Sequence, residues 1–102
     1  LYTCGSNDYG QLGDGTTTTP GFFATPRQIV SSGVSEVAAG WEHSLFLKTD
    51  GSLWAMGRNN KGQLGDDSTN DSHVPIEVQP AGTFPSGSKI RAGFNHSLAF
   101  DV

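Results

Sequence analysis

Residues 1–14 read Leu-Tyr-Thr-Cys-Gly-Ser-Asn-Asp-Tyr-Gly-Gln-Leu-Gly-Asp, and residues 53–66 return as Leu-Trp-Ala-Met-Gly-Arg-Asn-Asn-Lys-Gly-Gln-Leu-Gly-Asp. Self-similarity at a period of about 50 residues is typical of repeat architectures, in which each repeat is one supersecondary unit that packs on its neighbours. The chain therefore holds two copies of one repeat, which we place at residues 1–52 and 53–102.

A second block confirms the repeat. Val-Ala-Ala-Gly-Trp-Glu-His-Ser-Leu-Phe-Leu at residues 37–47 returns as Ile-Arg-Ala-Gly-Phe-Asn-His-Ser-Leu-Ala-Phe at residues 90–100. Gly40 and Gly93 each precede a histidine by three residues, where glycine offers either a left-handed conformation or a close backbone approach. We also expect the two Gly-Gln-Leu-Gly segments to be ordered loops whose leucines point inward.

The chain has the pattern of short β-strands. In residues 43–48 and 52–57, large side chains alternate on both faces, as in a strand that packs on two sides. The Asp-Gly pair at 50–51 between them favours a tight hairpin, because it tolerates positive φ angles. We expect eight strands, at residues 1–4, 27–30, 35–39, 43–48, 52–57, 74–78, 88–92 and 96–100.

Four short strands in a repeat of about 50 residues favour a β-propeller over a sandwich or a barrel. The chain also resembles the repeats of the regulator of chromosome condensation family, which form seven-bladed β-propellers. This resemblance rests on both Gly-Gln-Leu-Gly loops, on the strands that end at Gly5 and Gly57, and on the Val-Ala-Ala-Gly-x-x-His-Ser-Leu block with its second copy. It implies an all-β fold whose blades have four antiparallel strands.

The resemblance also sets the phase of the blades. It implies one complete blade at about residues 35–78, flanked by half-blades at residues 1–30 and 88–102. A half-blade leaves an unpaired strand edge, which is a template for another strand. Two arrangements would cover these edges: further repeats of a longer chain, or copies joined head to tail in a cyclic homo-oligomer with an even number of blades.

Composition and charge disfavour several classes of partner. The formal net charge is −4, with six Lys and Arg against ten Asp and Glu, and no basic run occurs. We therefore expect no nucleic-acid partner, because that affinity depends largely on cationic contacts. No stretch approaches the roughly 20 apolar residues of a membrane helix, so we expect no membrane partner. The single Cys4 excludes an internal disulfide.

The residues that could carry chemistry favour structural roles. His43 and His96 occupy the same place in successive repeats, so they lie one blade apart and do not converge on a metal. We expect each ring to bond nearby backbone, and we expect no catalytic residue, cofactor or metal. The acidic loop at 66–72 has oxygen ligands suited to calcium but lacks the glycine and the late glutamate of an EF-hand, which favours a solvated loop.

The sequence favours a noncatalytic β-propeller interaction scaffold, in which rigid blades hold variable loops for a protein partner. A guanine-nucleotide exchange factor, an activity known in this family, and a purely structural self-assembly module are the alternatives. The candidate partner-contact side chains are aromatic residues and acidic-loop residues, namely Phe22, Phe23, Trp41, Asp67, Asn70 and Asp71. For Trp41, packing within the propeller is the favoured alternative.

Overall fold

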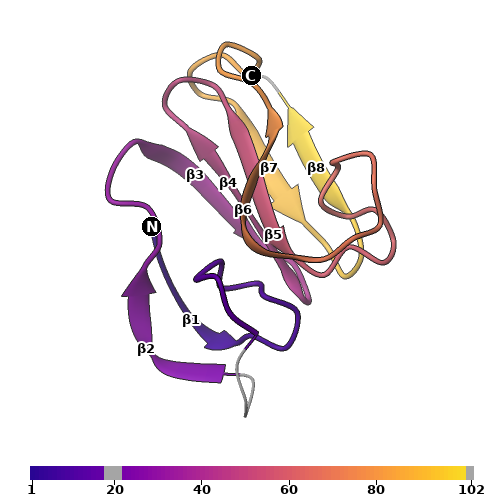
Figure 1. The fold of residues 1–102 in the computed structure, drawn as a ribbon. Coiled ribbons are helices and arrows are strands. Elements are labelled where there is room, and N and C mark those ends of the chain that lie inside the picture. Colours follow the sequence, from indigo (N-terminus) through magenta and orange to yellow (C-terminus); the bar gives the residue numbers. More distant parts are fainter. Residues whose placement is uncertain (18–21, 101–102) are drawn as a thin grey trace.

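The computed structural model describes residues 1–17 and 22–100, and this part of the chain is all β (Figure 1). It contains no helix long and apolar enough to cross a membrane. The strands, in chain order, are β1 (Tyr2–Ser6), β2 (Phe22–Gln28), β3 (Val34–Ala39), β4 (His43–Lys48), β5 (Leu53–Gly57), β6 (Ser72–Gln79), β7 (Lys89–Ala92) and β8 (Ser97–Phe100).

The strands form three antiparallel sheets that match the expected blades. A four-stranded sheet has the order β3-β4-β5-β6, and two-stranded sheets pair β1 with β2 and β7 with β8. Figure 1 shows the four-stranded sheet between the two pairs, and β7 packs against β3 and β4. The prediction of one complete blade flanked by two half-blades is confirmed.

The second strand begins earlier than the sequence predicted. We expected it at residues 27–30, but β2 starts at Phe22 and ends at Gln28. The reason is that the ladder continues through an irregularity in β1, so that Gly5 pairs with Phe23. Pro26 is compatible with this strand, because among the described strands β2 pairs with β1 alone and a proline on an edge loses no ladder hydrogen bond.

The core lies between sheets. Its buried side chains come from β4, β5, the following half-blade and one loop, and they are Leu45, Leu47, Ala55, Ile90 and Leu64. Leu12, the equivalent of Leu64 in the first repeat, is also buried, so the prediction that both loop leucines point inward is confirmed. Each blade therefore depends on its neighbour for part of its apolar core.

Equivalent positions differ in burial according to whether a neighbour covers them. Leu45 in β4 is 3% exposed, whereas Leu98, at the same position in β8, is 58% exposed. Phe46 is buried, whereas its equivalent Ala99 is exposed. Because the local sequence and strand are alike, the missing neighbour accounts for the difference.

Gly40 and Gly93 are required for close packing rather than for a left-handed conformation. A Cβ atom on Gly40 would overlap the imidazole of His43, and one on Gly93 would overlap that of His96. Neither glycine has a positive φ. The backbone nitrogens of these glycines donate to the carbonyl oxygens of the same histidines, at 2.8 and 2.9 Å, which closes each turn.

We expect Gly40→Ala to lower the free energy of unfolding by about 1–3 kcal/mol, because the added methyl displaces a buried ring. Urea denaturation measures this cost in the native background and in a His43→Ala background. The cost should shrink markedly when the ring is absent. An equal cost in both backgrounds would show that the ring contact is not the reason for glycine.

Candidate functional site at the loop end of the blades

The connections that carry most of the predicted contact residues leave the same end of the blades. His43, the first residue of β4, pairs with Gly57, the last residue of β5, so the β3–β4 turn and the β5–β6 connection emerge together. The equivalent connections of the half-blades follow the same topology. We call the end formed by residues 7–17, 40–42, 58–71 and 93–96 the loop end.

A buried asparagine organises the long loop of the complete blade. Asn59 is fully buried, and its Nδ2 donates to the carbonyl oxygens of Ser68 and Asn70 at 3.1 and 3.0 Å. Its Oδ1 accepts from the backbone nitrogen of Leu64 at 2.9 Å. One amide thus closes the loop and fixes the backbone of the leucine that enters the core.

Asn7 does the same in the first repeat. It is fully buried, its Nδ2 donates to the carbonyl oxygen of Thr16 at 2.9 Å, and its Oδ1 accepts from the backbone nitrogen of Leu12 at 3.1 Å. The sequence analysis missed both asparagines as loop organisers. The available signal was their recurrence at one place in the repeat.

The acidic loop is held partly by its own carboxylates. Asp66 Oδ1 accepts from the hydroxyl and the backbone nitrogen of Ser68, at 2.8 and 3.1 Å. The hydroxyl bond is the main reason that the pKa of Asp66 lies below its usual value, and it outweighs partial desolvation. Asp71 Oδ1 accepts from the backbone nitrogen of Asn59 at 2.8 Å. In the described residues, no group of three or more potential metal ligands gathers.

Three predicted contact residues lie in this loop. Asp67, Asn70 and Asp71 are all exposed. Asp67 has a φ of 65°, a conformation that its equivalent in the first repeat, Gly15, adopts with a φ of 85°. The strained aspartate therefore places a carboxylate where the other repeat has no side chain.

Trp41 stacks on the equivalent residue of the following half-blade. The ring centroids of Trp41 and Phe94 are 4.5 Å apart with an interplanar angle of 25°. The two side chains are nevertheless 65% and 57% exposed. Adjacent blades thus combine two aromatic side chains into one apolar surface, which we call the aromatic pair.

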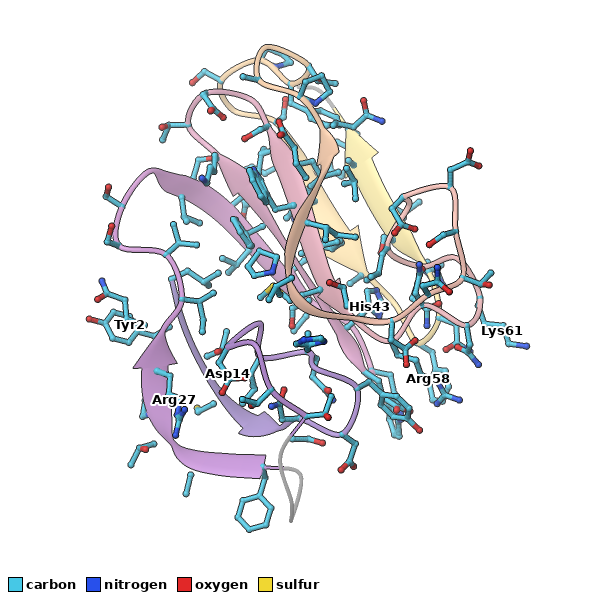
Figure 2. The ribbon with its side chains drawn as sticks, in the orientation of Figure 1. Tyr2, Asp14, Arg27, His43, Arg58 and Lys61 are labelled. Atoms are coloured by element: carbon cyan, nitrogen blue, oxygen red, sulfur yellow. The ribbon has the colours of Figure 1, made fainter. Side chains whose placement is uncertain are left out.

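A charged cluster lies next to Trp41 in the chain. Arg58, which is labelled in Figure 2, has its Nη1 3.0 Å from Glu42 Oε1 and its guanidinium carbon 4.5 Å from the ring centroid of Tyr9. The backbone nitrogen of Arg58 also donates to the Glu42 carbonyl oxygen at 2.9 Å. The cluster joins the loop of the first half-blade to the complete blade.

The structure places the His43 ring at the contact between two blades, and its hydrogen-bond partner differs from the prediction. We expected nearby backbone, whereas Nε2 lies 3.0 Å from Ser97 Oγ in the following half-blade. Ser97 Oγ in turn donates to the Gln63 carbonyl oxygen at 2.7 Å. Because that hydroxyl proton is already used, His43 Nε2 is the donor to Ser97. Burial is the main reason that the pKa of His43 is lowered.

The predicted phenylalanines belong to the first half-blade. Phe22 is the first residue of β2 and is 53% exposed. The side chain of Phe23 lies outside the described residues. Of the other predicted contact residues, Trp41 contacts Phe94 directly, and Asp67, Asn70 and Asp71 lie together in one loop.

Family models for the regulator of chromosome condensation (RCC1) repeat match the chain. One matches residues 1–47 and 50–100, and a second matches residues 34–63. Both copies of the repeat are therefore included in the match.

Curated relatives share the same repeats. The ultraviolet-B receptor UVR8 of Arabidopsis thaliana is 32% identical over 103 residues, which cover 97% of this chain and 22% of the relative. The secretion-regulating guanine nucleotide exchange factor of Bos taurus is 35% identical over 65 residues, which cover 64% of this chain and 14% of the relative. The chain thus spans less than a quarter of the length of either protein.

Solved structures confirm the propeller fold. Prp20p of Saccharomyces cerevisiae, whose structure was described with its binding properties to Gsp1p and histones, superposes with a TM-score of 0.80 at 24% identity. Human WBSCR16 superposes with a TM-score of 0.77 at 24% identity. Each match covers 99% of this chain and 26% of the solved one.

We expect Asn59→Ala to lower the free energy of unfolding by about 3 kcal/mol, since it removes the partner of the buried Leu64 backbone nitrogen and of the part-buried carbonyl oxygens of Ser68 and Asn70. Asn60→Ala is the matched control, because Asn60 is the exposed neighbour of Asn59 and its loss should change stability by less than about 0.5 kcal/mol. Chemical denaturation compares the two. Equal effects would contradict the organising role of Asn59.

The lowered pKa of His43 makes stability depend on pH. The unfolded chain binds a proton near pH 6.5 more readily than the folded chain. The stability that neutral, buried His43 contributes is therefore present above pH 6.5 and is lost as pH falls through the pKa of His43 in the folded chain. Denaturation midpoints measured between pH 8 and pH 5 should fall with acidification. His43→Asn should reduce this dependence on pH, whereas the same dependence in the native and the variant chain would exclude His43 as its source.

Proposed function

The chain belongs to the RCC1 repeat family, and from this membership we propose that it is a noncatalytic part of a β-propeller scaffold whose loop end binds a protein partner. The observation that carries the proposal is the aromatic pair, two large rings that stack on each other and remain more than half exposed. Exposed aromatic side chains held in one geometry are typical centres of protein interfaces.

The surroundings of the pair support a rigid binding surface. The turn that carries Trp41 is closed by the Gly40–His43 backbone bond, and the turn that carries Phe94 is closed by the equivalent Gly93–His96 bond. Little conformational entropy is therefore lost when a partner packs on the rings. The acidic loop and the net charge of −4 favour a partner with basic groups near its apolar contact.

The His43–Ser97 contact supports a noncatalytic role. A serine nucleophile needs a neighbouring histidine that accepts its proton. Here Ser97 donates to the Gln63 carbonyl oxygen, and His43 Nε2 donates to Ser97. The pair is thus arranged to hold two blades together.

An exchange factor for a small GTPase is the second candidate function. The similarity to the secretion-regulating guanine nucleotide exchange factor favours it. Nucleotide exchange by a propeller would also use a protein-binding face, so the two functions differ in whether bound nucleotide is released faster. Release of a fluorescent GDP analogue from a candidate small GTPase distinguishes them, and we expect no acceleration by this chain.

Binding to core histones and to Gsp1p, two proteins bound by a propeller of this fold, tests the proposed surface. We expect binding to at least one of them, and we expect Trp41→Ala to weaken it by about tenfold or more, as for a central interface residue. Val74→Ala, which truncates an exposed side chain on β6, should bind like the native chain. Fluorescence anisotropy measures the three affinities. Equal weakening by the two substitutions, or no binding to either protein, would contradict the assignment.

A further inference from the structure

The negative charge of the chain is concentrated at the loop end. This end contains six of the ten acidic residues and two of the six basic residues, which gives it a formal charge of −4. The remaining four acidic and four basic residues of the chain cancel. The two basic residues of the loop end are Arg58 and Lys61, both labelled in Figure 2. Because Arg58 already pairs with Glu42, an approaching partner meets a predominantly negative surface.

The carboxylates that recur in both repeats serve the fold. Asp14 and Asp66 occupy the same position of the repeat. Asp14 Oδ1 accepts from the Thr16 hydroxyl at 2.7 Å, and Asp66 Oδ1 accepts from the Ser68 hydroxyl at 2.8 Å. Each of these carboxylates closes a turn of its own loop, so both are occupied within the chain.

Two carboxylates of the loop end differ between the repeats. Asp8 corresponds to Asn60, and Asp67 corresponds to Gly15. Both aspartates are exposed, and among the described residues neither carboxylate has a hydrogen-bond or ion-pair partner. Because the fold does not use these two side chains, their charges are available to a partner.

Asp8 lies beside the turn of Trp41. The residue after Asp8 is Tyr9, and the residue after Trp41 is Glu42. Arg58 contacts both of these neighbours, because its guanidinium carbon lies 4.5 Å from the Tyr9 ring centroid and its Nη1 lies 3.0 Å from Glu42 Oε1. The loop of the first half-blade is thus held against the turn that carries the tryptophan.

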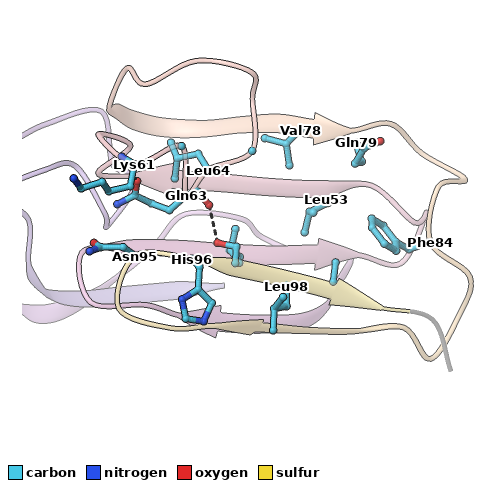
Figure 3. A pocket seen from close by; sticks show the side chains of 15 residues that line it. Leu53, Lys61, Gln63, Leu64, Val78, Gln79, Phe84, Asn95, His96 and Leu98 are labelled. Carbon is cyan, nitrogen blue, oxygen red and sulfur yellow. Dashed lines mark hydrogen bonds between the residues drawn. The ribbon is translucent and has the colours of Figure 1, made fainter.

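The loop of Asp67 is held against the turn of Phe94. Its Gln63 carbonyl oxygen accepts from Ser97 Oγ at 2.7 Å, a hydrogen bond drawn as a dashed line in Figure 3. Ser97 is the first residue of β8 and follows Phe94 by three positions. Each ring of the aromatic pair therefore has, from the blade before it, a loop with one free carboxylate.

This arrangement combines an apolar centre with negative charge around it. Large rings at the centre of an interface supply much of its affinity, and complementary charges at its rim select the partner. A segment with an apolar side chain between cationic side chains fits both features, whereas an acidic segment meets like charges. The aromatic pair and both free aspartates lie in turns and loops, not in strands, so the surface belongs to the connections of the blades.

We propose that the loop end binds a positively charged segment of a protein partner, with an apolar side chain on the aromatic pair and cationic side chains beside Asp8 and Asp67. This inference rests on the proposed function and names the chemistry of the partner. Electrostatic attraction brings the segment to the loop end, and packing on the rings holds it there.

Two fluorescently labelled synthetic peptides test the charge of the partner. One consists of repeated Arg-Leu-Ser units. The other has citrulline in place of every arginine, which removes the positive charge and keeps the shape of the side chain. By fluorescence anisotropy, this chain should bind the arginine peptide about tenfold or more tightly than the citrulline peptide. Equal affinities, or binding of neither peptide, would overturn the proposal.

Matched substitutions test where the charge acts. Asp67→Asn removes one negative charge from the loop end, and asparagine tolerates the φ of 65° at this position. Glu77→Gln removes one from an exposed position on β6. Asp67→Asn should weaken binding of the arginine peptide about three- to fivefold, and Glu77→Gln should change it by less than about 1.5-fold. Equal weakening would show that net charge alone attracts the peptide, which rejects the proposed site.

Histone and Gsp1p binding, measured separately with Trp41→Ala, distinguishes this inference from the proposed function. Retained binding that depends on Trp41, together with equal affinities for the two peptides, rejects this inference alone. If Trp41→Ala leaves every affinity unchanged, the proposed function is rejected with it.

Discussion

The hydroxyl of Ser97 accepts a hydrogen bond from His43 and donates one to the Gln63 carbonyl oxygen. One side chain of the following half-blade thus holds both a strand and a loop of the complete blade. Ser44 makes the matching bond to the Gln11 carbonyl oxygen of the preceding half-blade, at 2.8 Å. The contact between neighbouring blades is therefore polar as well as apolar, and each buried loop leucine follows directly after the glutamine whose carbonyl oxygen accepts one of these bonds.

The dependence of each blade on its neighbour explains how stability is distributed along the chain. Repeat proteins gain much of their stability from interfaces between neighbouring units. Leu45 and Leu98 show the effect within a single molecule, since one sequence position is buried where a neighbour exists and exposed where none does. The same interfaces set the function proposed here, because the aromatic pair exists only where two blades place Trp41 and Phe94 side by side.

Much of the fold could be predicted from the sequence, because it follows from repetition. The duplicated blocks indicated eight strands and the burial of Leu12 and Leu64, and the family resemblance implied the phase of the blades. The start of β2 could not be predicted, because it depends on an irregularity in β1 that only the paired backbone reveals. The partner of His43 could not be predicted either, because it lies 54 residues away in the next half-blade.

The candidate site was less accessible to sequence reasoning than the fold. Asn59 and Asn7 are equivalent in the repeats, but an asparagine beside glycine-rich loops equally fits a solvated turn. Their burial became evident only in the structure, where each side-chain amide donates to carbonyl oxygens of its loop, two for Asn59 and one for Asn7. Trp41 was a candidate contact residue for which packing was the favoured role, whereas its stacking on Phe94 depends on the spacing of adjacent blades.

Amide hydrogen exchange at several protein concentrations tests most directly whether neighbouring blades supply the burial of each repeat. In dilute solution the account predicts slow exchange for Leu45 and Leu47 in β4 and fast exchange for their equivalents Leu98 and Phe100 in β8. Protection of the β8 amides should rise only when another blade covers them. Equal protection of β4 and β8 in a dilute monomer would show that each half-blade is stable alone and would contradict the account.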